Sequence, residues 1–181
     1  DSDRELEKKI RDSLKRLEEA LRELEERLKR SLEDDERVHE ELRRRAERIR
    51  ETIKKRLSDK DTLDKLKKEV DKLLTDLERV NRDTKRLNKE LLDKAREVVK
   101  KLKEDNRRLL EDLKEIIKKP TRSELVKRMK ERVDELHKRT EELLERLKEE
   151  LKKLHDETRD INRELKKRLE DLERKIEEAA K

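Results

Sequence analysis

Apolar residues recur at every third or fourth position along nearly the whole chain. In the first third, the apolar stripe over residues 6–57 advances in steps that average 3.64 residues. The two later stripes, over residues 63–117 and 129–176, advance in steps of about 3.6 residues. This spacing is the period of an α-helix with one apolar face. The pattern therefore predicts an all-α protein built from long helices.

Two short segments interrupt these stripes. Residues 58–62 read Ser-Asp-Lys-Asp-Thr, and residues 119–124 read Lys-Pro-Thr-Arg-Ser-Glu. Asp and Ser side chains in the first segment can cap the next helix, while Pro120 disfavours helical geometry at the residue before it. Thr121 with Glu124 fits the T-x-x-E capping box, and Ser2 with Glu5 repeats it at the start of the chain. We predict helices over about 3–57, 61–118 and 122–180.

Such short turns make neighbouring helices antiparallel, so the expected fold is one up-down-up, coiled-coil-like three-helix bundle over residues 1–181. Each helix would run about 85 Å, which makes the expected bundle elongated. A strict 3.5-residue repeat would impose a left-handed supercoil, whereas a period near 3.6 predicts a nearly untwisted bundle. The pattern also recurs every 18 residues, as in the Leu pairs at 73–74, 91–92 and 109–110. We interpret this period as a geometric repeat within one domain.

Polar residues replace apolar ones at several stripe positions. Two residues of antiparallel helices share a height when their numbers add to a constant, near 119 for the first hairpin and near 240 for the second. Four sets of three residues fit both conditions to within a helical turn: Ser13, Asn106 and His137; Ser31, Asn88 and His155; Asp35, Thr84 and Thr158; His39, Asn81 and Asn162. The second set is the first shifted by 18 residues along every helix.

An unpaired polar group inside a protein costs about 1–3 kcal/mol. Twelve such groups would remove a typical folding stability of about 5–15 kcal/mol. We therefore predict that these residues pair across helices as structural hydrogen-bond layers. Such layers can fix the register of the helices, which matters because a slide by one 18-residue repeat would keep much of the apolar contact.

Composition agrees with a long helical bundle. The chain has no Gly, no aromatic residue and no Cys, and 61% of its residues are charged. Its net charge of +6 is small beside 58 basic and 52 acidic residues, and the signs are interspersed. Even the basic run 43–45 is flanked by Glu40, Glu41 and Glu47, so nucleic-acid binding is not predicted. No apolar run suffices for a membrane span or signal peptide, and localisation is not predicted. The first residue is Asp1, so we expect trimming from a longer chain.

The polar residues offer little catalytic chemistry. Each predicted layer holds at most one His, too few for a zinc site with three or four ligands, so no metal or other cofactor is expected. Ser31 near His155 could suggest a nucleophile and a base. The sequence predicts no oxyanion hole and no substrate cleft, so we expect that the chain is not an enzyme. One hypothesis is a pH response, in which buried neutral His residues destabilise the fold below about pH 6.5.

These traits together resemble a known class of protein. The absent Gly and aromatic residues, the Glu/Lys/Arg surface, the 18-residue period, the capped turns and the Ser/Asn/His layers resemble computationally designed straight three-helix bundles with buried hydrogen-bond networks. The resemblance covers the whole chain and implies a de novo, hyperstable protein with no natural function. Natural spectrin-like repeats also have three helices, but they usually carry core aromatic residues.

The sequence leaves more than one function open. The first is a monomeric structural scaffold that needs no partner, because 28% apolar residues leave little for a second hydrophobic face. The second is an interaction module, in which the polar layers or the wider stripe of the second helix set the specificity of a homo- or hetero-oligomer. A weaker third is a pH- or metal-responsive switch built on His39, His137 and His155.

Overall fold

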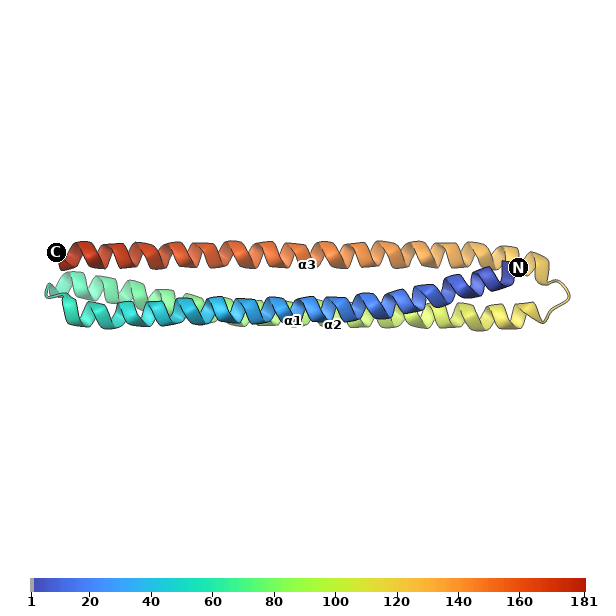
Figure 1. Ribbon diagram of the computed structural model, residues 1–181, viewed down its shortest axis with the longest axis horizontal. Coiled ribbons are helices and arrows are strands. Elements are labelled where there is room, and N and C mark those ends of the chain that lie inside the picture. Colours follow the sequence, from blue (N-terminus) through green and yellow to red (C-terminus); the bar gives the residue numbers. More distant parts are fainter. Residues whose placement is uncertain (1) are drawn as a thin grey trace. The chain divides into compact units, whose positions relative to one another are not determined.

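The computed structural model describes residues 2–181, and nearly all of them belong to three α-helices (Figure 1). These are α1 (Ser2–Arg56), α2 (Lys60–Ile117) and α3 (Arg122–Ala180). Each predicted boundary lies within one residue of the observed one. The apolar faces of all three helices meet in shared cores, which confirms the predicted all-α, up-down-up three-helix bundle.

The two turns begin their helices in different ways. Asp59 is the N-cap of α2, because its Oδ2 accepts hydrogen bonds from the backbone N–H of Thr62 at 3.3 Å and from its hydroxyl at 2.5 Å. Before α3, the Thr121 carbonyl accepts from the N–H of Leu125 at 3.4 Å. In the described part of the chain, no hydrogen bond joins the side chains of Thr121 and Glu124, so the capping box expected there does not form. The Ser2 side chain, expected to pair with Glu5, lies outside the described residues.

Contacts along the chain define two compact units, and each contains a stretch of every helix. Unit 1 comprises Asp1–Leu28 and Glu90–Lys152, and unit 2 comprises Lys29–Lys89 and Lys153–Lys181. In both units, the helices form because strong helix formers fill them and no Gly interrupts them. The two Ser/Asn/His sets related by the 18-residue period lie in different units, one in each.

Each unit has its own apolar core, and burial of one Leu or Ile side chain contributes about 1.5–3 kcal/mol. The unit 1 core includes Ile10 and Leu17 of α1, Val99 and Leu113 of α2, and Met129 of α3. The unit 2 core includes Ile53, Val70, Leu73, Leu77 and Leu169. Both cores draw on all three helices.

Unit 2 also contains a stretch with no buried apolar side chain, which we call the polar segment: residues 29–41, 78–89 and 153–164. The buried apolar positions resume at Leu42, Leu77 and Leu165. The polar segment contains three of the four sets predicted from the sequence. It also contains the large hydrophobic side chains that the described residues leave exposed: Val38, Leu87 and Ile161, one on each helix.

Candidate functional site

Two Ser–His pairs join α1 to α3. In unit 1, the Ser13 hydroxyl lies 3.2 Å from Nδ1 of His137. In unit 2, the Ser31 hydroxyl lies 3.3 Å from Nδ1 of His155. Ser13 is buried and His137 half-buried, whereas Ser31 is half-buried and His155 exposed. The His rings therefore flank the core rather than lie at its centre.

The asparagines of the same two sets bond within their own helix. Asn106 and Asn88 are both buried, and their side-chain N–H groups donate to the backbone carbonyls of Leu102 and Thr84, each at 2.7 Å. The Oδ1 atom of Asn88 is buried without a hydrogen-bond partner. The structure thus brings Ser and His together but directs both amides along α2.

The two remaining sets lie in the polar segment. Thr84 and Thr158 are buried, while the other four side chains are partly buried: Asp35, His39, Asn81 and Asn162. Within residues 2–181, no side-chain hydrogen bond or ion pair joins these six residues to one another or to the rest of the chain. Only the four residues of the Ser–His pairs, among the twelve predicted, make hydrogen bonds between helices.

Two titratable groups of the polar segment are shifted toward their neutral forms. Burial raises the pKa of Asp35 to about 6, although the nearby His155 lowers it. Burial lowers the pKa of His39, although the nearby Glu40 raises it. Both shifts have the same main cause, because an environment with little water disfavours a charge of either sign.

The sequence analysis missed one buried polar residue, Thr140. Its side chain is 1% exposed, and its hydroxyl donates to the Leu136 carbonyl at 3.0 Å. Thr140 lies 18 residues before Thr158, so the internal repeat was the signal that could have revealed it. It bonds within α3, as the asparagines do within α2.

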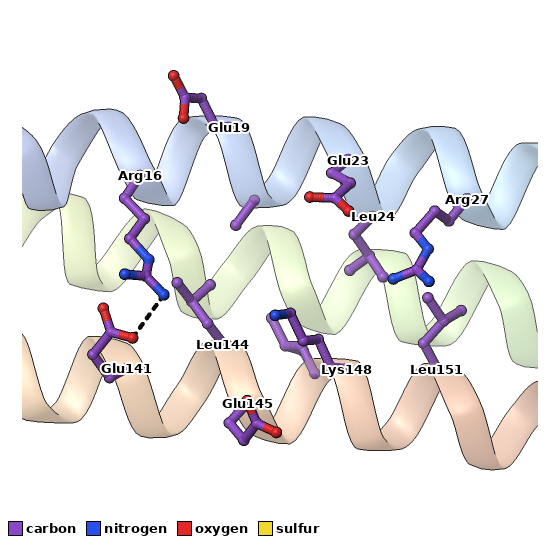
Figure 2. Close-up of a pocket in the computed structure, with 12 residues that line it drawn as sticks. Arg16, Glu19, Glu23, Leu24, Arg27, Glu141, Leu144, Glu145, Lys148 and Leu151 are labelled. Carbon is purple, nitrogen blue, oxygen red and sulfur yellow. Dashed lines mark ion pairs between the residues drawn. The ribbon is translucent and has the colours of Figure 1, made fainter.

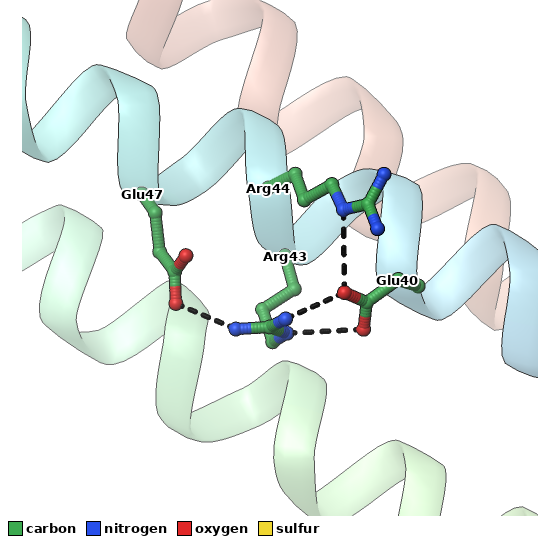
Figure 3. A network of polar contacts seen from close by, with 4 residues as sticks. All are labelled: Glu40, Arg43, Arg44 and Glu47. Atoms are coloured by element: carbon green, nitrogen blue, oxygen red, sulfur yellow. Dashed lines mark hydrogen bonds and ion pairs between the residues drawn. The ribbon is translucent and has the colours of Figure 1, made fainter.

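The densest basic run of the chain faces carboxylates (Figure 3). Arg43 forms ion pairs with Glu40 at 2.5 Å and with Glu47 at 2.7 Å, and Arg44 contacts Glu40 at 3.3 Å. The Arg43 hydrogen bond holds the pKa of the Glu40 carboxyl below its usual value. Arg45 pairs with Glu173 of α3 at 2.7 Å. This run is therefore not the uncompensated cationic surface that nucleic-acid binding needs.

A groove between α1 and α3 is open in each unit. In unit 1, it encloses about 210 Å³ beside Leu24 and Leu144, and the 2.7 Å ion pair between Arg16 and Glu141 crosses it (Figure 2). In unit 2, it encloses about 520 Å³. The residues that matter there, which define the unit 2 groove, are Asp35, Val38 and Glu41 of α1, and Asn162, Arg163 and Lys166 of α3.

Other kinds of site find little support in the described residues. No group of three or more His, Cys, Asp or Glu side chains within residues 2–181 could hold a metal ion. No helix in the same range is long and apolar enough to cross a membrane. No protein-family model, curated protein or solved structure matches this chain, so no relative supplies a function for it.

Proposed function

We propose that the chain is a computationally designed structural scaffold, a hyperstable bundle without substrate, metal or cofactor, whose polar pairs select the register of its helices. The observation that carries this proposal is the repetition of one bond. Ser13–His137 and Ser31–His155 join the same two helices with the same separation of 124 residues. Repetition at this regularity is typical of a backbone generated from helical parameters.

The backbone supports a designed origin as well. Within residues 2–181, no peptide bond is cis and no residue has a positive φ. Natural proteins often carry such irregularities, whereas idealised designed backbones avoid them. The chain also lacks Gly, so even its turns are built without the residue that natural turns commonly use.

The Ser–His pairs can select the register because each forms at only one offset between α1 and α3. A slip by one helical turn moves these partners about 5.4 Å apart. The buried Ser13 hydroxyl would then lose its partner at a cost of about 1–3 kcal/mol. Surface ion pairs between α1 and α3, such as Lys9–Asp134 at 2.6 Å, contribute less, about 0–1 kcal/mol each.

Thermal unfolding monitored by circular dichroism tests the scaffold proposal. A designed bundle of this kind is expected to remain helical above about 90 °C. A cooperative transition in the range of ordinary domains, about 45–65 °C, would contradict a hyperstable scaffold.

The interaction module remains a second candidate because Val38, Leu87 and Ile161 expose apolar surface in the polar segment. A module that joins copies of the chain would hide these side chains in the assembly. Sedimentation equilibrium separates the two functions. A mass of 22.3 kDa indicates the monomeric scaffold, and a multiple of that mass indicates the module.

A further inference from the structure

The groove between α1 and α3 is closed by an ion pair in unit 1 but not in unit 2. In unit 1, Arg16 and Glu141 bridge it at 2.7 Å (Figure 2). The residues 18 positions later are Asp34 and Arg159, again of opposite charge. Each pairs within its own helix instead, Asp34 with Arg37 at 2.5 Å and Arg159 with Asp156 at 3.1 Å. No ion pair therefore joins the walls at that height.

The walls of the unit 2 groove carry opposite charges that lack ion-pair partners. Asp35 and Glu41 stand on the α1 wall, and Arg163 and Lys166 stand on the α3 wall. None of these four side chains forms an ion pair with another described residue. Val38, which is 38% exposed, lies between them. The groove thus presents an apolar strip with an acidic side and a basic side.

We propose that the unit 2 groove binds one amphipathic α-helix of a partner protein. The apolar stripe of that helix would cover Val38, its basic flank would face Asp35 and Glu41, and its acidic flank would face Arg163 and Lys166. The groove extends over residues 34–45 of α1 and 155–166 of α3, which corresponds to about three helical turns. Helices dock in such grooves through apolar residues at the i, i+3/i+4 and i+7 positions. This binding goes beyond the role of a passive scaffold.

A second copy of the chain fits the groove less well than a free helix. The described residues expose only three large hydrophobic side chains, one on each helix, so a folded copy has no apolar stripe to offer. A stable interface between two folded proteins usually buries about 1,200–2,000 Å². A single helix with a free apolar face can instead bury its stripe in the groove itself.

Two synthetic peptides of about 20 residues test this binding. The bipolar peptide has a Leu stripe with Lys along one flank and Glu along the other. The mixed peptide has the same composition and stripe, but both signs alternate along each flank. Each peptide carries one Trp, and because the protein has no aromatic residue, Trp fluorescence anisotropy reports on the peptide alone.

The bipolar peptide should bind the wild-type protein about tenfold more tightly than the mixed peptide. The double variant Arg163→Glu, Lys166→Glu makes both walls acidic and should abolish that preference. The double variant Lys153→Glu, Lys167→Glu alters net charge equally at exposed residues outside the groove lining and should keep it. Circular dichroism confirms that both variants remain folded.

Three results would overturn the proposal. The first is no anisotropy change for either peptide at about 100 μM protein. The second is equal binding of the two peptides, or equal weakening by the two double variants. The third is a homodimer, in the absence of peptide, that Arg163→Glu with Lys166→Glu dissociates, since the groove would then belong to a second copy.

Discussion

The hydroxyl of Ser13 lies 3.2 Å from Nδ1 of His137 and joins α1 to α3 in unit 1. The same contact recurs in unit 2 between Ser31 and His155, at 3.3 Å. Both pairs span 124 residues, so both require the same offset between two helices that run in the same direction. Each pair therefore marks the register in its own unit.

The two Ser–His pairs should contribute unequally to stability because they differ in burial. Ser13→Ala should lower the free energy of unfolding by about 1 kcal/mol, since the mutation removes the partner of a half-buried ring. Ser31→Ala should lower it by less than about 0.5 kcal/mol, because water can reach the exposed His155. Guanidinium unfolding of the two variants measures both values, and equal losses would contradict the unequal burial.

Asn88 should destabilise the bundle through its unpaired oxygen. Its Oδ1 atom is buried without a partner, although its amide nitrogen donates to the Thr84 carbonyl. Asn88→Leu removes the unsatisfied atom and adds apolar surface to the interior, so we expect a gain of about 1–2 kcal/mol. Chemical denaturation measures the gain. A variant less stable than the wild type would show that the oxygen has a partner in solution.

Asp35 and His39 should give pH dependences of opposite sign. The pKa of Asp35 is about 6 in the folded protein, above its unfolded value of about 3.9. The folded state is therefore penalised above about pH 6, and the penalty disappears as the pH falls toward the unfolded value. The pKa of His39 is lowered by burial, so its contribution is present above about pH 6.5 and is lost as the pH falls.

Single variants separate these opposing effects. Asp35→Asn should gain about 1 kcal/mol at about pH 8, a figure reduced for the half-exposed carboxyl, and little at about pH 4. His39→Gln should lose less stability than the wild type between about pH 7 and pH 5. Urea midpoints at several pH values measure both changes. A gain for Asp35→Asn that does not vary with pH would rule out titration as its cause.

The helices and the heights of the polar residues could be predicted because both depend on local spacing. The directions of the side-chain bonds could not. Asn106 shares a height with Ser13, yet its short amide reaches the Leu102 carbonyl one turn away on its own helix. Residue numbers fix a height along the bundle, but they do not fix the rotamer or the partner within reach. Thr140 was missed for a related reason, since it shares no predicted layer.

The two helix starts show the same limit and provide a further prediction. Sequence favoured caps at both turns, but only Asp59 makes the bonds of an N-cap in the structure. Asp59→Ala should therefore cost about 1 kcal/mol, whereas Thr121→Ala should change stability by a few tenths at most. Thermal unfolding of the pair checks this, and a larger loss for Thr121→Ala would indicate that its capping box forms in solution.

The distance between α1 and α3 in unit 1 tests most directly whether the Ser–His pairs select the register. Spin labels at Cys residues introduced at the exposed Arg22 and Glu149 are specific because the chain has no native Cys. The labelled parent should give one narrow distance distribution. Ser13→Ala, Ser31→Ala, His137→Leu and His155→Leu together should add a second population, displaced along the helix by about 5 Å. A single unchanged distribution in this variant would contradict the assignment of register to the polar pairs.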